Sequence, residues 1–574
     1  MSPPGTFRVE VLQRGLAPDK RVLSDDNNGK GYPAGDNGIP PDASINGCNW
    51  PPAYQLQVGA DWVSGVYLAR LTTANGDSTD VLFVIKAAAL GSNSKILFQL
   101  AVNTAQAYNN WGGKSLYPYN SSGYDPADPS GNNRARQVSF DRPGIEGHVS
   151  DEGGSDSPFA SYEYNFVQWL EMNGFEVEYC TSIDLHSDPH FLDNYQLLLS
   201  VGHDEYWSNN MRNNVERFIA NGGNFAIFGG NICWWQVRFS DDLRTMICYR
   251  IKAEDIGTAN DLVTVNWWAD PVFRPGNTMT GVDSRQGAYW ANGNRAGLAY
   301  KVQFLQHWVF YSALDGDHFG ADQVVIGYEE TDAADLTNHG NGAVPRATGA
   351  DGTPLNFVCL AIADGQDWAV RSGGSSGWAT MGIFHNNGTV FTAATTNWSL
   401  YLSLNGGWTS FDQITQNILR RLSCPCTFAA ELVNAGFEQY DADGVPSGWQ
   451  LEGAGSVSPG DVNIGHTPLE VDAVRGETWI SQGPFPLESQ NYYSAGCWAR
   501  ADQPGATIRL QSMASWIDFA IAVHPGDGLW HYLYAVGVPD AGEDPVFPAR
   551  VKIQVAQGIA RFDSVRVEAI APPP

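Results

Sequence analysis

The sequence predicts an α/β protein with a parallel sheet core, a small antiparallel β unit before it and a β-sandwich after it. Two observations support this: a buried strand, a helix and a second buried strand follow one another over residues 197–231, and short alternating strands begin after residue 426. A length of 574 residues also exceeds what one hydrophobic core holds. We therefore expect an irregular segment plus β unit over residues 1–90, an α/β domain over residues 91–425 and the sandwich over residues 427–574.

The N-terminal part divides at about residue 50. Residues 1–45 are rich in Pro, Gly, Asp and Asn, which favours irregular segments on the surface. Residues 54–58, 64–71 and 81–86 alternate or run apolar over strand lengths, with Gly and Asp turns between them. These patterns predict a small antiparallel β unit.

The central part alternates strands and helices. Residues 95–102 and 175–180 are typical of buried strands, and residues 163–174 have helical spacing that ends in Asn-Gly. Residues 197–202 and 224–230 flank a helix that begins after Ser208, which is expected to cap it. This arrangement predicts a right-handed βαβ unit, and ligands of such sheets lie beyond the carboxyl ends of the strands.

The end of the α/β domain is predicted by a strand over residues 389–394 and an amphipathic helix over residues 411–422, while residues 256–345 are loop-rich. Cys424-Pro-Cys426 follows. Its spacing is not C-x-x-C and no second pair completes a zinc site, so we interpret it as structural.

Charge and composition exclude several classes of partner. The formal net charge of −29 would be repelled by nucleic acid and by an anionic membrane, so neither is expected, and a neutral small substrate suits the chain better. No apolar run is long enough to cross a membrane as a helix. The start Met-Ser-Pro-Pro-Gly-Thr lacks the features of a signal peptide, so a cytoplasmic location is expected, with a leader already removed as the alternative.

Polar and aromatic residues gather where three predicted strands end. The clusters span residues 103–117, 202–207 and 228–235. A His-Asp-Glu run such as 203–205 is most often a solvated turn or a helix cap. Here it lies at the ligand edge of a sheet together with two aromatic residues, which favours a functional site.

These motifs resemble the large (β) subunit of bacterial N,N-dimethylformamidase and its relatives. The resemblance covers about residues 50–425 and rests on the Ala-Tyr-Asn and Gly-Gly-Lys-Ser-Leu-Tyr stretches of residues 106–117, on Phe-Asp-Arg-Pro at residues 140–143, and on Gly-His-Asp-Glu-Tyr-Trp at residues 202–207. The central strand–helix–strand also resembles the class I glutamine amidotransferase fold. The resemblance implies hydrolysis of a small neutral amide of the formamide type.

The resemblance further implies a single iron ion, held by Tyr108, Tyr117 and Glu205. Charge supports this set, because two phenolates and one carboxylate carry about −3 and balance a ferric ion. Hard oxygen donors also favour a trivalent ion over zinc. A Gly-Gly turn at residues 112–113 closes the separation between the two tyrosines.

Further site residues follow from the same resemblance. His203 and Asn231 are implied to orient water or to stabilise an oxyanion, and Glu329 is implied to be the general base. A lysine of the formamidase falls on Arg250, which keeps the charge but cannot donate a proton near neutral pH. A nucleophilic hydrolase of the same fold is the weaker alternative, because the turn after residue 201 offers no cysteine and Cys233 has no evident histidine partner.

The sandwich has a resemblance of its own. Asn-Ala-Gly-Phe-Glu at residues 434–438 and Pro-Ser-Gly-Trp at residues 446–449 resemble carbohydrate-binding jelly rolls. The sandwich is therefore expected either to bind a glycan or to be a passive appendage, and the sequence leaves both open. It also leaves open whether the chain forms a homo-oligomer. A non-catalytic glycan-binding protein with a relic α/β scaffold is the competing function. Candidate sugar-stacking residues are Trp479, Tyr492, Tyr493, Trp516 and Trp530.

Overall fold

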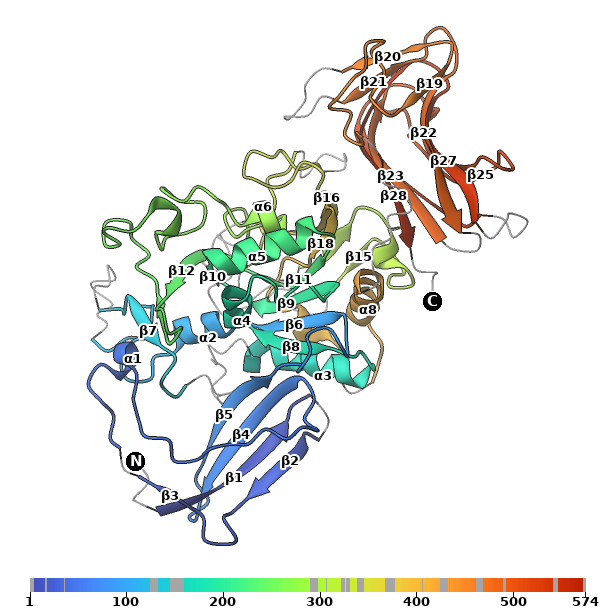
Figure 1. Cartoon of the computed structure of the whole chain (residues 1–574). Coiled ribbons are helices and arrows are strands. Elements are labelled where there is room, and N and C mark those ends of the chain that lie inside the picture. Colours follow the sequence, from blue (N-terminus) through green and yellow to red (C-terminus); the bar gives the residue numbers. More distant parts are fainter. Residues whose placement is uncertain are drawn as a thin grey trace. The chain divides into compact units, whose positions relative to one another are not determined.

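The computed structural model is mostly β-sheet with few helices (Figure 1). It describes residues 5–15, 18–35, 37–123, 133–144, 159–289, 298–305, 307–321, 326, 331–337, 345–366, 377–404, 406–423, 432, 434–460, 468–488, 492–539 and 546–570. No helix among these residues combines the length and the apolar character needed to cross a membrane.

The N-terminal sheet contains β1 (Gly5–Gln13), β2 (Lys20–Asp25), β3 (Tyr32–Ala34), β4 (Gly65–Thr73) and β5 (Ser78–Ile85). The strands follow the order β2-β1-β4-β5, and β3 pairs with β1. The strands expected over residues 64–71 and 81–86 are confirmed.

Two predictions for this N-terminal sheet are wrong. Residues 1–45 are not irregular throughout, because Phe7, Val9 and Val11 alternate inward and form a strand despite the neighbouring turn residues. Residues 54–58 form no strand. Tyr54 and Leu56 instead pack against the apolar core of the sheet from an extended segment.

The central sheet contains β6 (Ile96–Leu100), β8 (Glu178–Thr181), β9 (Leu197–His203), β11 (Asn224–Gly230), β14 (Tyr300–Val302), β15 (His318–Phe319), β16 (Val358–Asp364), β17 (Trp378–Asn386) and β18 (Gly388–Thr392). The order is β15-β14-β16-β17-β18-β11-β9-β6-β8. The run from β18 to β8 is parallel throughout, and β17 joins β18 antiparallel. The more specific likeness to class I glutamine amidotransferases stays a prediction.

Helix α5 (Asn209–Ala220) connects β9 to β11, which confirms the predicted βαβ unit. Ser208 caps it by accepting a hydrogen bond from the Met211 amide. The other helices are α1 (Ala43–Asn46), α2 (Val102–Tyr108), the π-helix η1 (Phe159–Glu163), α3 (Tyr164–Met172), α4 (Ser182–Ser187), η2 (Asn260–Leu262), α6 (Asn277–Thr280), η3 (Trp308–Phe310), η4 (Trp398–Tyr401) and α8 (Ser410–Leu422).

A small four-stranded sheet adds a wall beyond the carboxyl ends of β9 and β11. It contains β7 (Gln137–Ser139), β10 (Tyr206–Ser208), β12 (Trp235–Phe239) and β13 (Thr245–Ile247), in the order β10-β12-β13-β7. Strands β10 and β12 follow directly on the ends of β9 and β11, so this sheet continues the two segments that carry the predicted site.

The C-terminal strands form two antiparallel five-stranded sheets that enclose one apolar core. The strands are β19 (Gln450–Gly453), β20 (Ser456–Pro459), β21 (Leu469–Asp472), β22 (Thr478–Glu488), β23 (Tyr492–Ala501), β24 (Ala506–Ser512), β25 (Asp518–Val523), β26 (Trp530–Gly537), β27 (Val546–Val555) and β28 (Ile559–Ile570). The sheet orders are β19-β22-β27-β24-β25 and β20-β21-β28-β23-β26.

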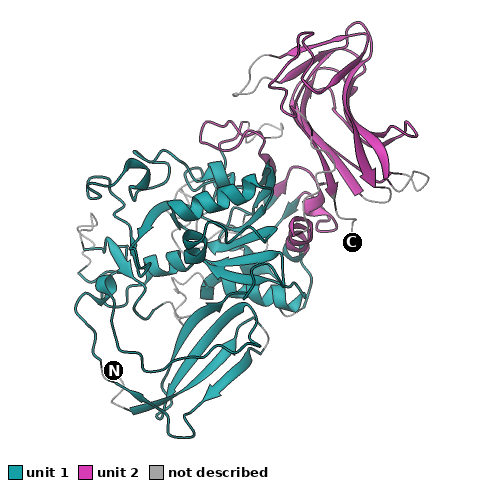
Figure 2. Cartoon of the chain, viewed as in Figure 1, with its two compact units in different colours: residues 1–300, 318–334, 362–412 teal, residues 301–317, 335–361, 413–574 magenta. Residues whose placement is uncertain are grey.

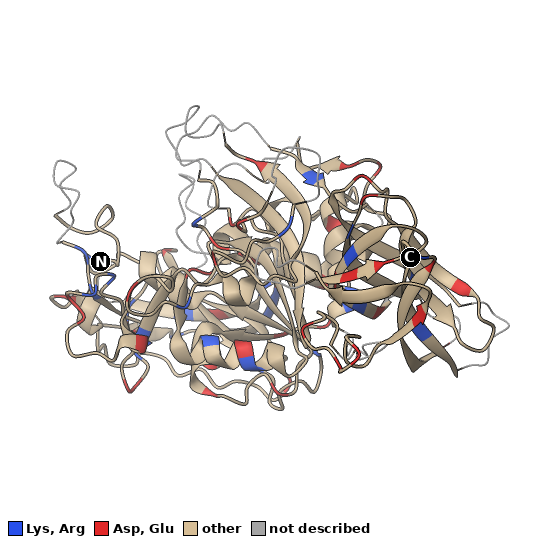
Figure 3. Ribbon diagram, turned by 90° about the horizontal axis from the view of Figure 1, so that it is seen from above, with Lys and Arg blue, Asp and Glu red and all other residues tan. Residues whose placement is uncertain are grey.

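The chain divides into two compact units (Figure 2). Unit 1 comprises residues 1–300, 318–334 and 362–412, and unit 2 comprises residues 301–317, 335–361 and 413–574. The predicted division into 1–90, 91–425 and 427–574 stays a prediction. Asp and Glu occur on many separate segments of the described chain (Figure 3).

Candidate functional site

Three side-chain oxygens converge where α2 and β9 end. The hydroxyl of Tyr108 lies 3.0 Å from Oε2 of Glu205, and the hydroxyl of Tyr117 lies 2.7 Å from the same oxygen. The two hydroxyls are 2.7 Å apart, and the two phenol rings stack with their centres 4.2 Å apart. The three residues that sequence analysis selected as metal ligands therefore form one cluster.

The loop from residue 108 to residue 117 is built to return the second tyrosine to the first. Helix α2 ends at Tyr108, and a turn closes where the Gly113 amide donates to the Asn110 carbonyl. Gly112 and Gly113 both have positive φ, as the predicted turn requires. The Leu116 amide then donates to the Ala107 carbonyl, which places Tyr117 beside Tyr108.

Arg142 binds the backbone of that loop. It is buried, and its guanidinium donates to the backbone carbonyls of Trp111 at 2.6 Å and Asn109 at 2.9 Å. Five donors in a fixed fork suit this role, because one side chain can bind several carbonyls at once. Arg142 comes from the Phe-Asp-Arg-Pro stretch that sequence analysis noted without assigning it a role.

Backbone hydrogen bonds fix the position of Glu205. Its amide donates to the hydroxyl of Thr104 on α2, and its carbonyl accepts from the amides of Trp234 and Trp235. The side chain is buried. The carboxylate therefore has a fixed position relative to both α2 and the segment that follows β11.

A third tyrosine and an arginine extend the cluster. The hydroxyl of Tyr206 donates to that of Tyr117 at 2.8 Å, and Arg250 donates to the hydroxyl of Tyr206. The Arg250 guanidinium also lies 3.9 Å above the ring of Tyr117 and 4.7 Å from that of Trp235. Arg250 thus reaches the site through Tyr206 and Tyr117.

Burial and charge affect the ionisation of this cluster. Burial, together with Glu205, raises the pKa of Tyr117 well above its usual value, and burial raises the pKa of Tyr206 likewise. Burial by itself would lower the pKa of Arg250, but Tyr206 and Tyr117 outweigh it and raise that pKa. These directions favour the protonated forms of Tyr117 and Tyr206 and the charged form of Arg250.

His203 and Asn231 stand beside Glu205. The ring nitrogen Nε2 of His203 is 3.6 Å from Oε2 of Glu205 and 3.2 Å from the side-chain amide nitrogen of Asn231. Asn231 adopts a left-handed backbone conformation with φ of 51°, which Asn tolerates better than most residues. Both predicted residues are buried and lie next to the predicted ligand set.

Two residues without a sequence signal fix Asn231. The Asp332 carboxylate accepts a hydrogen bond from the backbone amide of Asn231 at 2.9 Å. The Ser284 hydroxyl lies 2.6 Å from that carboxylate and 3.1 Å from the side-chain oxygen of Asn231. Asp332 is fully buried, and burial raises its pKa to about 7. This bonding turns the amide group of Asn231 towards His203.

A cavity of about 230 Å³ lies beside Asn231. None of the described residues that line it is charged. The lining residues are Asn231, Trp234, Ser284, Gly287, Ala288, Tyr289 and Thr331. Asn231 therefore belongs both to this neutral cavity and to the surroundings of the three converging oxygens.

The donor set fits one metal ion. Two oxygen ligands that lie about 2.0 Å from an ion at right angles are about 2.8 Å apart, which matches the separations within the cluster.

The remaining predictions concern Glu329 and three cysteines. Glu329 lies outside the described residues, as do Cys424 and Cys426. Cys233 is buried and its pKa is raised to about 12, which disfavours it as a nucleophile.

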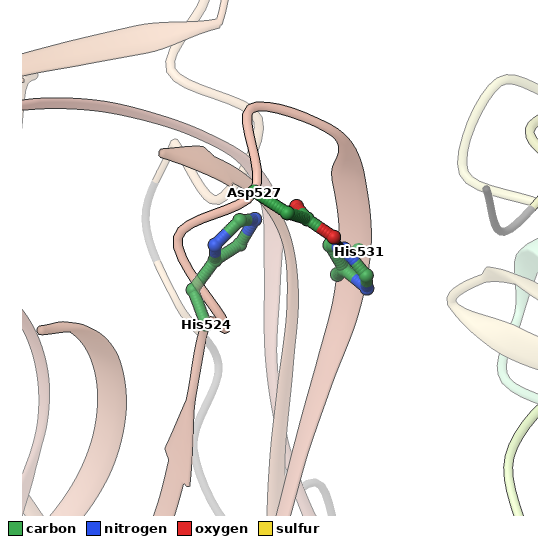
Figure 4. A group of neighbouring side chains, drawn as sticks. All are labelled: His524, Asp527 and His531. Atoms are coloured by element: carbon green, nitrogen blue, oxygen red, sulfur yellow. Dashed lines mark hydrogen bonds and ion pairs between the residues drawn. The ribbon is translucent and has the colours of Figure 1, made fainter. Parts of the chain in front are cut away.

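A second group of possible metal ligands lies in the sandwich, between β25 and β26 (Figure 4). His524 uses both ring nitrogens, because Nδ1 accepts from the Gly526 amide and Nε2 faces the Leu529 carbonyl at 2.9 Å. His531 pairs with Asp527 at 2.9 Å. These hydrogen bonds explain why the three side chains lie close together, as parts of one hydrogen-bonded turn.

The aromatic residues proposed for sugar stacking differ in exposure. Tyr493 belongs to the apolar core of the sandwich, which removes it from the candidates. Trp516 is the most accessible, with 59% of its surface exposed. Trp479, Tyr492 and Trp530 are partly buried.

The family model described as "N,N-dimethylformamidase beta subunit-like, C-terminal" matches residues 10–413. A search of curated proteins found no match. Structural neighbours include the xylan-binding CBM22-1 domain from Paenibacillus barcinonensis, at 11% identity over 24% of this chain and 92% of that one, with a TM-score of 0.19. A carbohydrate-binding module from Cellvibrio mixtus lichenase 5A, in complex with cellotriose, matches at 15% identity over 25% and 98%, with a TM-score of 0.17.

A third neighbour is the enzymatically active domain of tailspike protein 4 from bacteriophage CBA120. It matches at 16% identity over 25% of this chain and 21% of that one, with a TM-score of 0.19. Matches at this level carry no argument about this chain.

Proposed function

Because the chain belongs to the N,N-dimethylformamidase beta subunit-like family, we propose that it is a metal-dependent hydrolase of a small neutral amide of the formamide type. The observation that carries the proposal is the convergence of the Tyr108, Tyr117 and Glu205 oxygens within 3.0 Å of one another. The three groups lie at the carboxyl end of a parallel strand, the edge at which such sheets bind ligands.

In this proposal Tyr108, Tyr117 and Glu205 hold one iron ion, expected as Fe³⁺. Bound there, the ion would supply Lewis-acid polarisation of the amide carbonyl. Tyr206 and Arg250 support the ligands, since a hydrogen bond and a cation beside a phenol oxygen favour its deprotonated form. Arg250 stands where the formamidase has a lysine. It supplies the positive charge beside the phenols, and no proton transfer is assigned to it.

The protein groups beside the ligands supply orientation. Asn231 presents a side-chain amide N–H group whose position is fixed by Asp332 and Ser284, as suits stabilisation of a developing oxyanion. His203 is placed to orient a water or to share that task. Glu329 remains the proposed general base on the strength of the sequence resemblance, taking a proton from water and returning it to the leaving amine.

The cavity beside Asn231 supports a small neutral substrate. Its volume of about 230 Å³ suits a molecule of few heavy atoms, and its walls combine the aromatic rings of Trp234 and Tyr289 with small uncharged residues. None of the described lining residues would supply a counter-ion to a charged substrate. These features favour a short dialkylated or unsubstituted formamide over a charged amide.

The competing proposal is a glycan-binding protein whose α/β part is a non-catalytic scaffold. The β-sandwich of residues 450–570 is the observation that favours it. The two proposals differ in one measurable property, since only the hydrolase requires a bound metal.

The test is iron content, visible absorption and hydrolysis of N,N-dimethylformamide, measured on one preparation. We expect about one iron per chain, a colour from phenolate-to-iron charge transfer, and a loss of that colour in Tyr108→Phe and Tyr117→Phe. Tyr119→Phe is the matched control, because Tyr119 is exposed and nearby. A colourless parent protein with zinc or without metal would contradict the proposal. A coloured iron protein that releases no amine would refute the substrate class alone.

A further inference from the structure

The sandwich has a polar outer face that is independent of the site described above. In the sheet β19-β22-β27-β24-β25, alternate residues point into the core and the others point outward. On the central strand β27 the outward residues are Arg550, Lys552 and Gln554, while Val551 and Ile553 lie in the core.

Three cations meet at the middle of this face. Lys552 pairs directly with Arg509 of β24 across the ladder, and Arg550 lies two residues before Lys552 on the same side of β27. Like charges directly opposite each other destabilise a sheet. We call Arg509, Arg550 and Lys552 the cationic row. Such a row is unexpected in a chain with a net charge of −29.

Three carboxylates lie near the row, and two of them form ion pairs with the arginines of the row itself. Arg550 pairs with Glu452 of β19 at 2.8 Å, and Arg509 pairs with Asp518 of β25 at 2.6 Å. Glu477 accepts a hydrogen bond from Gln554. The edges of the face therefore carry its negative charge and the centre carries its positive charge.

Lys552 differs from the two arginines. It is only 9% exposed, and among the described residues no hydrogen bond or ion pair engages its ammonium group. Its one close contact is the ring of Trp479, whose centre lies 4.0 Å from Nζ. Burial, reinforced by Arg550, lowers the pKa of Lys552. A buried ammonium without an acceptor is costly unless a ligand supplies one.

Two indole rings flank the row. Trp479 lies on β22, next to β27, and Trp516 lies in the turn between β24 and β25. The Arg550 guanidinium is 5.1 Å from the ring of Trp516, which is otherwise exposed. A cationic centre between two flat apolar rings suits a chain of sugar rings that carry anionic groups, because the rings can stack while the anions face the cations.

We propose that this outer face binds an acidic polysaccharide and that Lys552 binds its carboxylate or sulfate groups. Nucleic acid offers the same combination of anions and rings, but the overall charge of the chain opposes it. A neutral glycan would leave the ammonium group of Lys552, the cation of the row without an ion pair among the described residues, without an anionic partner. The face therefore selects for charge on the sugar.

The experiment measures binding of the full-length protein to polygalacturonate by calorimetry at pH 7 and at two salt concentrations. Fully methyl-esterified polygalacturonate serves as the uncharged chain with the same backbone. Dextran sulfate tests sulfate as the source of the anion, and a single-stranded oligonucleotide tests nucleic acid. The variants are Lys552→Met, Lys552→Arg and Trp516→Ala. Lys301→Met is the matched control, because Lys301 is an exposed lysine of the same unit.

We expect polygalacturonate or dextran sulfate to bind and the methyl ester to bind at least about 10-fold more weakly, the effect of one hydrogen bond to a charged group. Lys552→Met should lose the same factor, while Lys552→Arg and Lys301→Met stay close to the parent. Trp516→Ala, which removes an exposed ring, should also weaken binding. Equal binding of the methyl ester, an unchanged Lys552→Met, or preferential binding of the oligonucleotide would each overturn the proposal.

Discussion

Arg250 and Lys552 are two cations in the same geometry with opposite surroundings. Each lies about one van der Waals contact above an aromatic ring, at 3.9 Å from the centre of Tyr117 and 4.0 Å from that of Trp479. Arg250 donates to Tyr206 and has the Glu205 carboxylate nearby, so its surroundings raise its pKa. Burial, reinforced by Arg550, lowers the pKa of Lys552, although Asp518 and Glu477 act in the opposite direction.

The difference teaches how to interpret a buried charge. Arg250 has Tyr206, Tyr117 and Glu205 beside it, and a cation in such surroundings holds groups that are or can become anions. Lys552 has no hydrogen bond or ion pair to any described residue, and a cation of this kind can be retained for a ligand that supplies the missing acceptor. The predictions below test the two halves of this comparison, beginning with the largest expected effect.

Glu205→Ala should remove the metal and all turnover. Glu205 provides the single carboxylate of the proposed ligand set, so two phenols and Arg250 would be left without it. The loss of metal affinity should exceed the roughly 10–100-fold that removal of an outer partner causes. Iron per chain and formamide turnover are measured together, with the exposed Glu176→Ala as the control. Full iron retention in Glu205→Ala would show that the ligand set is wrong.

Glu329→Gln should keep the iron and lower turnover by about 10²–10⁴-fold, since an amide retains the shape of the carboxylate but cannot accept a proton. Iron content, measured on the same samples, separates this effect from that of Glu205→Ala. If the variant is as active as the parent, the general base is another residue, and His203 is the next candidate to be substituted.

Arg250→Met should weaken iron binding and turnover by about 10–100-fold, because the phenols of Tyr117 and Tyr206 would lose the cation that favours their ionised forms. Arg250→Lys should recover part of the loss. The comparison is made by iron titration and by the position of the charge-transfer band. Unaltered iron affinity in Arg250→Met would mean that the arginine serves packing alone.

Lys552→Met should raise the melting temperature by about 2 °C, because it relieves repulsion with Arg509 and Arg550 while keeping the apolar stem. The same change at Lys301 should leave the melting temperature level. Thermal unfolding followed by circular dichroism decides this. A fall of several degrees for Lys552→Met would mean that its charge stabilises the fold in a way that no described contact accounts for.

Asp332 offers the smallest effect, and it mirrors Lys552 as a buried carboxylate that forms no ion pair with any described residue. Burial raises its pKa to about 7, above the ordinary value near 4. The folded chain therefore binds this proton more tightly than the unfolded chain does. Its stabilising contribution is complete below about pH 4 and is lost as the pH rises through 7.

The melting temperature of the parent should therefore fall between pH 5 and pH 8 relative to that of Asp332→Asn, which carries no titrating group at that position. Asp241→Asn, at an exposed position, is the control that should follow the parent at every pH. Parallel curves for the parent and Asp332→Asn would contradict the raised pKa.

Much of the central fold could be predicted because the strands of a parallel sheet are apolar throughout. Residues 197–202 and 224–230 are of this kind, and Ser208 and the glycines at 222–223 bound the helix between them. Strand β1 was missed because Pro, Gly and Asp residues surround a short alternating core of Phe7, Val9 and Val11. The turn composition of the wider segment concealed the period of two.

The site divides in the same way. Tyr108, Tyr117, Glu205, His203 and Asn231 lie in motifs, and the structure brings them together. Asp332 and Ser284 carry no local signal, because their role depends on a bond to the backbone of Asn231 that only the folded chain creates.

The make-up of unit 2 could not be foreseen from the sequence. Arg346 donates to the buried Asp563 at 2.9 Å, and Arg566 donates to the carbonyl of Asn356. These contacts join residues 335–361 to strands that begin more than 100 positions later. A composition change at residue 426 locates the start of the sandwich strands and says nothing about earlier segments that pack with them.

The carbonyl of Glu205 accepts two hydrogen bonds, from the amides of Trp234 and Trp235. Trp234 lines the neutral cavity, so one wall of the cavity and one proposed metal ligand share a backbone connection. For protein engineering this means that redesign of the cavity through residues 232–235 would displace the ligand as well. If the chain is the proposed hydrolase, its substrate range is better altered through residues 287–289, which line the same cavity from a separate segment. Substitutions there would leave the backbone bonds of Glu205 intact.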